Sequence, residues 1–60
     1  MKFIVAILDD EWETFVSQDE DVALPGEERA KKFPTIELAH SCQMRWIREG
    51  HVALVRAIQT

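Results

Sequence analysis

The stretch that decides the fold is KFIVAIL, residues 2–8, because any strand it forms is apolar on both faces. With the two-residue period of a strand, Phe3, Val5 and Ile7 point to one side, and the equally apolar side chains on the other side are Ile4, Ala6 and Leu8. A strand without a polar face belongs in the middle of a sheet. We therefore expect residues 2–8 to form a central strand with a neighbour on each side.

Two further segments are typical of strands. Residues 12–16 follow an acidic turn and place Trp12, Thr14 and Val16 on one face and Glu13 and Phe15 on the other, which predicts a half-buried second strand of a hairpin. Residues 52–58 are apolar except for Arg56. We expect these strands to flank the first one, in the spatial order 12–16, 2–8, 52–58, with the last strand antiparallel to the first.

One long helix is expected to start near Thr35 and to run to Glu49, just before Gly50. Thr35 follows a proline and is a suitable N-cap, and Gly50 suits the left-handed residue that ends a helix. One broad arc of this helix is mostly apolar and the opposite arc is polar. The first arc contains Ile36, Leu38, Ala39, Cys42, Trp46, Ile47 and Glu49. We expect Leu38, Trp46 and Ile47 to pack against the central strand.

The expected fold is a single α+β domain over residues 1–60, with a small antiparallel three-stranded sheet and one main amphipathic helix in the order β-β-α-β. Pro25 and the acids after it also allow a short second helix over residues 26–33. Without that helix, one face of the sheet would stay uncovered. An exposed apolar sheet face in so small a protein indicates a partner or a homodimer.

The composition excludes several classes of protein. The single cysteine, Cys42, cannot form an intramolecular disulfide, which favours a reducing cytoplasm. The longest apolar run is far shorter than the ~20 residues that a membrane helix needs, and no signal-peptide pattern follows residues 1–2. We therefore expect a soluble cytoplasmic protein.

The charges are unevenly distributed along the chain. Residues 1–28 contain nine acids and one lysine, a balance of 1 − 9 = −8, whereas residues 29–60 contain six basic and two acidic residues, a balance of 6 − 2 = +4. The net charge is −4. Direct binding to nucleic acid is not expected, since affinity for phosphates comes from Lys and Arg. The chain suits a basic partner instead.

The acids of the first half are the candidate partner-binding residues. They are Asp9, Asp10, Glu11, Glu13, Asp19, Glu20, Asp21, Glu27 and Glu28. Strands about 4.8 Å apart can present carboxylates at spacings loosely similar to those of phosphates, so such a surface could imitate a nucleic-acid backbone. The alternative is an ordinary solvated surface that keeps a small protein soluble.

No residue pattern indicates catalysis, a metal site or a cofactor site. His40 and Cys42 diverge by about 200° on the expected helix, so they cannot face one metal ion. Ser17 and Ser41 lack the context of an activated nucleophile, and residues 24–26 lack the glycines and the lysine of a phosphate loop. We expect a non-enzymatic protein without a metal or cofactor.

Four other side chains have structural interpretations. Trp12 and Trp46 are expected to be core or interface anchors, because no basic residues alternate with them as they would in a base-stacking surface. Arg45 and Arg48 lie in the last turn of the expected helix, where positive charge opposes the helix dipole. The dipole is sufficient to explain both arginines.

Part of the sequence resembles the HicB-type antitoxin domain, in which an acidic turn, a following aromatic residue, an LPG segment and a helix succeed one another. The resemblance covers residues 1–5, 9–11, 15–16, 24–26 and 35–37. Trp12 and Glu13 stand where that family has a turn glycine. The resemblance implies an antitoxin that neutralises a small ribonuclease toxin.

Two other resemblances imply inhibitors of bacterial machinery. The order strand, strand, helix, strand, with Gly50 before residues 52–58, is similar to small podophage inhibitors of bacterial RNA polymerase. The length and acidity resemble those of phage anti-CRISPR proteins. We favour the last interpretation, in which an acidic, DNA-mimicking surface binds a basic bacterial protein, preferably a subunit of a CRISPR-Cas effector, and blocks DNA binding. Polymerase inhibition and toxin neutralisation are the alternatives.

Overall fold

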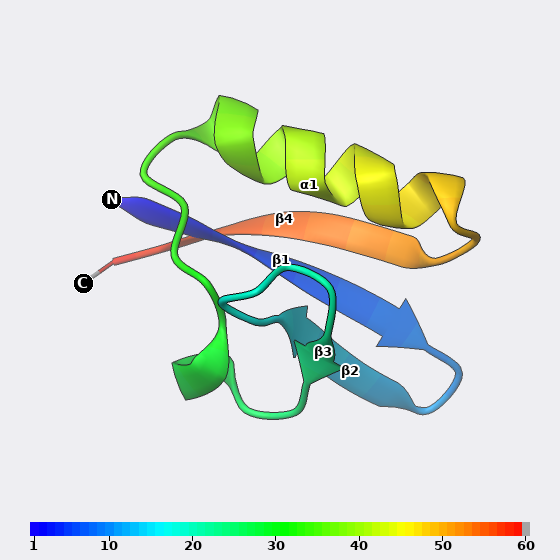
Figure 1. The fold of residues 1–60 in the computed structure, drawn as a ribbon. Helices are drawn as coiled ribbons and strands as arrows, with labels where there is room; N and C mark the ends of the chain where they lie inside the picture. Colours follow the sequence, from blue (N-terminus) through cyan, green and yellow to red (C-terminus); the bar gives the residue numbers. More distant parts are fainter. Residues whose placement is uncertain (60) are drawn as a thin grey trace.

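The computed structural model describes residues 1–59, which form one sheet with a helix packed on one face (Figure 1). The strands are β1 (Lys2–Asp9), β2 (Trp12–Val16), β3 (Ala23–Leu24) and β4 (Val52–Ile58), and their order in the antiparallel sheet is β3-β2-β1-β4. A 3-10 turn, η1 (Glu27–Arg29), and a helix, α1 (Ile36–Arg48), lie between β3 and β4 in the chain. No helix among the described residues is both long and apolar enough to cross a membrane.

The predicted α+β class, the central position of β1 and its antiparallel pairing with β4 are confirmed. The predicted sheet lacks one strand, because Ala23 and Leu24 also pair with the end of β2. The loop before them is closed by the Ser17 N–H, which donates to the carbonyl oxygen of Val22 at 2.9 Å. Two paired residues are too few to show the alternation from which strands are predicted.

Helix α1 begins where the sequence predicts and ends at Arg48, one residue before the predicted end at Glu49. The Thr35 hydroxyl caps it by accepting a hydrogen bond from the Leu38 N–H at 3.3 Å. Gly50 follows the helix with a φ of 95°, in the left-handed region that glycine adopts without strain. Its N–H donates to the Ile47 carbonyl oxygen, and the next N–H donates to that of Trp46, which satisfies carbonyls of the last turn.

The buried stripe of α1 is narrower than predicted. Ala39, Cys42 and Trp46 are buried, whereas Leu38 and Ile47 are 52% and 40% exposed. The prediction that these last two pack against the central strand is therefore wrong. The helix packs against β1 and β4, so only the side chains pointing straight at this narrow surface reach it. Leu38 and Ile47 flank the contact instead.

Strand β1 is buried on both faces, as predicted, and separates two apolar cores. On the helix side, Val5 packs in a cluster that includes Trp46. On the opposite side, Ile4 packs with Phe15 of β2 and with Ala30, which follows η1. The second sheet face is thus partly covered by the chain itself.

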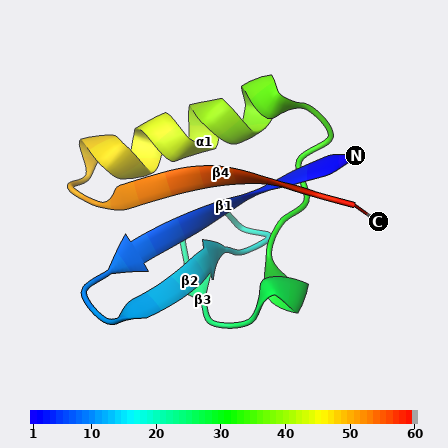
Figure 2. The ribbon, with the colours of Figure 1, turned by 180° about the vertical axis from the view of Figure 1, so that it is seen from behind.

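The segment after η1 joins the two cores by passing around the end of the sheet. Figure 2 shows it rising from η1 past the start of β1 to α1. Ala30 is buried on the face away from the helix, and Phe33 is buried on the helix side. The Lys31 N–H donates to the Val16 carbonyl oxygen at 2.9 Å, and Phe3 and Phe33 exchange two backbone hydrogen bonds.

The short helix allowed over residues 26–33 is reduced to the single turn η1. Ala30 already has an extended backbone, with φ of −69° and ψ of 141°. An extended chain is needed because three residues must span from one face of the sheet to the other. The cover is incomplete, and Leu8, Val52 and Leu54 on the same face remain exposed.

Candidate functional site

Two of the candidate acids are committed to contacts within the chain. The Glu13 carboxylate accepts hydrogen bonds from both terminal nitrogens of Arg56 across the sheet. Asp19 accepts the Ser17 hydroxyl at 3.0 Å and the Asp21 N–H at 3.1 Å. These carboxylates shape the sheet surface and the loop after β2.

The hydrogen bonds to Asp19 also affect its titration. The Asp21 N–H first, and the Ser17 hydroxyl second, lower the pKa of Asp19 from its ordinary value of 3.8. A carboxyl whose pKa is lower in the folded state stabilises that state above the unfolded pKa and loses this effect as the pH falls through the folded pKa. The loop is therefore stabilised at neutral pH.

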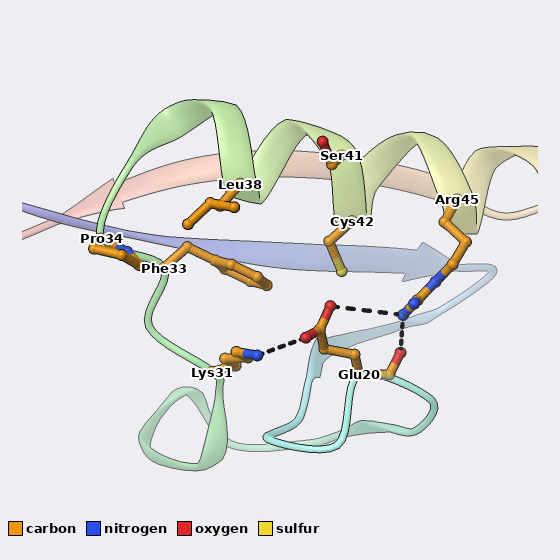
Figure 3. A pocket seen from close by; sticks show the side chains of 8 residues that line it. All are labelled: Glu20, Lys31, Phe33, Pro34, Leu38, Ser41, Cys42 and Arg45. Atoms are coloured by element: carbon orange, nitrogen blue, oxygen red, sulfur yellow. Dashed lines mark hydrogen bonds and ion pairs between the residues drawn. The ribbon is translucent and has the colours of Figure 1, made fainter.

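Glu20 connects three separate parts of the fold (Figure 3). Its carboxylate accepts a hydrogen bond from Lys31 Nζ at 2.5 Å and lies 3.9 Å from Arg45 Nη2. Its backbone carbonyl oxygen accepts Arg45 Nη2 at 2.6 Å and Trp46 Nε1 at 3.3 Å. The residue has a φ of 64°, in the left-handed region, which these contacts hold in place. We therefore assign Glu20 to the fold rather than to partner binding.

An open pocket of about 380 Å³ lies beside this ion pair, between α1 and the segment before it. Phe33 and Leu38 contribute apolar walls, and the Cys42 thiol points into the pocket from the helix. Lys31 and Arg45 at the rim face the carboxylate described above. The charged groups are thus largely satisfied by one another, and no pair of acid and base is set up for proton transfer.

Cys42 is expected to be an unreactive thiol. Burial, and then the nearby Glu20 carboxylate, raise the pKa of Cys42, so the thiolate that reacts with electrophiles is scarce at neutral pH. We predict that the folded protein reacts with a disulfide reagent such as DTNB at least about tenfold more slowly than the urea-unfolded chain. Cys42→Ser supplies the background rate. Equal rates in the folded and unfolded chains would contradict the burial of the thiol.

The turn between β1 and β2 carries acids of a different kind. Asp9, Asp10 and Glu11 are exposed and make no ion pair with any residue in 1–59. Trp12 comes next and is 74% exposed. Exposed tryptophan is unusual in a small monomer and is enriched among the residues that dominate protein–protein interfaces. Charge and apolar area therefore occur together at this turn.

A second acidic group lies at the opposite end of the sheet, after β2 and in η1. Asp21, Glu27 and Glu28 are exposed and make no ion pair within the described part of the chain. No exposed aromatic side chain accompanies them. This group is the natural comparison for the β1–β2 turn.

The histidine and cysteine side chains face apart, as the helical period predicts. His40 is exposed and lies 3.2 Å from the Gln43 amide oxygen, whereas Cys42 is buried. Across residues 1–59, no three His, Cys, Asp or Glu side chains gather in a way that could hold a metal ion.

Comparison of the chain with protein-family models, curated proteins and solved structures gives no significant match. The β1–β2 turn, with three unpaired carboxylates beside an exposed tryptophan, is the candidate binding site.

Proposed function

We propose that this protein is a non-enzymatic binder of a basic protein surface and that the β1–β2 turn makes the contact. The observation that carries the proposal is the sequence of Asp9, Asp10 and Glu11, all exposed and unpaired within residues 1–59, followed by the exposed Trp12. Carboxylates accelerate association with a basic surface. A tryptophan supplies the apolar area that is buried on contact.

The favoured target is the DNA-binding surface of a bacterial CRISPR-Cas effector, so that the protein acts as an anti-CRISPR inhibitor in the host cytoplasm. Surfaces that bind nucleic acid are rich in Lys and Arg, and an acidic turn on a chain of net charge −4 is suited to compete with DNA there. Bacterial RNA polymerase and a small ribonuclease toxin carry surfaces of the same type and are the alternative targets.

The proposed contact is smaller than the acidic set that the sequence suggests. Glu13, Asp19 and Glu20 are engaged inside the chain, so charge reversal at residues 19–21 would disturb the loop and the helix contact as well as any binding. That change cannot separate binding from folding. Neutral substitutions in the two unpaired acidic groups can.

The test compares two triple variants with the same net charge. Asp9→Asn, Asp10→Asn and Glu11→Gln change the net charge from −4 to −1, and so do Asp21→Asn, Glu27→Gln and Glu28→Gln at the other end. Asparagine also tolerates the φ of 44° at residue 10. We expect the first variant to raise Kd for the effector about 10- to 100-fold and to flatten its salt dependence. The second should change Kd less than about threefold.

The measurement is titration of each labelled variant with the effector, with DNA as competitor, at several salt concentrations. RNA polymerase and a small basic ribonuclease toxin are titrated in parallel to separate the three targets. Equal losses in the two triple variants would show that only net charge matters. If the turn variant binds all targets as tightly as the parent, the β1–β2 turn is not the contact.

A further inference from the structure

The outer edge of β4 carries backbone groups that the sheet does not use. In an antiparallel ladder, the N–H and C=O of successive residues point alternately to the two neighbours. Phe3 exchanges both hydrogen bonds with Phe33 on the side of β1 away from β4, so the even-numbered residues of β1 bond to β4. The register then leaves the N–H and C=O of Ala53, Val55 and Ala57 pointing outward.

This edge is long and weakly protected. The ladder with β1 runs without interruption over seven residues of β4, which contain neither proline nor glycine. The other edge strand, β3, has two residues and is followed by Pro25. Proteins usually protect exposed edges with short strands, prolines, bulges or charges. On β4, Gln43 Nε2 reaches over to the Ala53 carbonyl oxygen at 2.8 Å, and Arg56 is the one charge.

Apolar side chains flank the edge on both faces of the sheet. On the face away from the helix, Val52 and Leu54 are exposed. On the helix face, Gln43 marks the side of α1 that lies next to the edge. Ile36 precedes Gln43 by seven residues and Ile47 follows it by four, so all three lie on the same side of the helix. Both isoleucines are exposed. A strand added to this edge would therefore lie between two apolar strips.

We propose that the edge binds a second copy of the chain, with β4 antiparallel to β4 about a two-fold axis at Val55. This register pairs Val55 with itself and Ala53 with Ala57, so all the outward backbone groups are satisfied. It also places Leu54 opposite Arg56, whereas an axis at Arg56 would oppose two like charges. A carbonyl oxygen has two lone pairs, so Ala53 can accept the new N–H while keeping Gln43.

Charge favours a second copy as the occupant. The single charged residue of the edge, Arg56, is paired with Glu13. Within residues 1–59, the unpaired carboxylates lie at the β1–β2 turn, after β2, in η1 and at Glu37 and Glu49 in the first turn and at the C-cap of α1, and none lies on β4 itself. Two molecules of net charge −4 can therefore meet at β4 without bringing unpaired carboxylates together. A stable dimer needs at least about 600 Å² of buried surface per copy, which is about one seventh of the 4129 Å² surface of this molecule.

The first measurement is the mass and the amide exchange of the purified protein across a range of concentrations. Sedimentation equilibrium should show the 7.0 kDa chain shifting to twice that mass as its concentration rises. Over the same range, the Val55 and Ala57 amides should exchange at least about tenfold more slowly, while the Leu54 and Arg56 amides are already protected in the monomer. This alternation distinguishes strand pairing from contact through either face.

Two matched variants test the register. Leu54→Lys and Leu54→Glu remove the same apolar side chain from an exposed position, so both should fold. In the dimer, residue 54 of each copy lies opposite Arg56 of the other copy, so the contact occurs twice. Lysine at position 54 would repel Arg56 in both contacts, whereas glutamate would attract it. We expect the dimer Kd to be about tenfold higher for the lysine variant than for the glutamate variant.

A 7.0 kDa species at every concentration, with unchanged exchange of the Val55 and Ala57 amides, would overturn the proposal. So would a dimer in which these amides stay unprotected, because it would then use another surface. Equal weakening by the two substitutions at Leu54 would rule out the register about Val55.

A synthetic chain with N-methylated Val55, which lacks that outward N–H, should remain folded and monomeric. All of these readouts are independent of the proposed inhibitory function.

Discussion

Trp46→Ala is expected to remove about one third or more of the free energy of unfolding at 25 °C. Trp46 is the largest side chain of α1 that reaches the core beneath the helix, and its indole N–H also holds the Glu20 carbonyl oxygen at 3.3 Å. Truncation of a buried tryptophan costs about 3–5 kcal/mol. At 0.05–0.15 kcal/mol per residue, the free energy of unfolding of this chain is only about 3–9 kcal/mol. Urea denaturation followed by circular dichroism measures the loss.

The chain contains its own control for this experiment. Trp12→Ala removes the same side chain from a position that is 74% exposed, and should change the free energy of unfolding by less than about 0.5 kcal/mol. The same variant should bind the proposed partner more weakly. If Trp46→Ala has the denaturation midpoint of the parent protein, the helix does not pack on the sheet through this face.

The predictable part of the fold depends on patterns within single segments. Residues 3–8 are apolar on both faces of the strand, which places β1 in the centre of the sheet. Thr35 and Gly50 mark the two ends of α1 because capping is decided by the residues at the ends themselves. An apolar run interrupted by Arg56 alone similarly predicts Val52–Ile58 with its observed bounds. Each of these features can be predicted from residues that are close together in the sequence.

The unpredicted part depends on what distant segments do to one another. Strand β3 exists because the loop after β2 closes back on it, and two residues carry no periodic signal. Ala30 is a small residue in a charged stretch, and its burial follows only from the path of the chain around the sheet. The exposure of Leu38 and Ile47 likewise reflects how narrow a surface the sheet offers to α1.

The candidate site also has a part that the sequence predicts and a part that depends on distant residues. The concentration of acids in the first half is visible in the sequence, but their pairing is not. Glu20 meets Lys31 eleven residues away and Arg45 twenty-five residues away, and Glu13 meets Arg56 across forty-three. The helix dipole therefore explains Arg45 only in part. Apart from Glu13, Asp19 and Glu20, which are engaged within the chain, the acids of the first half form two small groups.

Ala30→Glu is expected to destabilise the protein by about 3–5 kcal/mol, because it forces a charged and much larger side chain into the core on the face away from the helix. Ala30 is completely buried against Ile4 and Phe15. This small residue covers the centre of the sheet face that lies away from the helix. The measurement is again urea denaturation, with the two-state free energy extrapolated to water.

Lys32→Glu is the control, because it places the same side chain two residues later at an exposed position, and it should cost less than about 0.5 kcal/mol. The pH dependence separates charge burial from simple overpacking. A buried glutamate has a pKa above its unfolded value of about 4.3, so the folded state prefers the protonated form. The deficit of Ala30→Glu relative to the control should therefore be smallest below pH ~4.3 and should grow as the pH rises above it. A deficit that does not change with pH would mean that the new carboxylate reaches water, and that the segment after η1 does not close this face of the sheet.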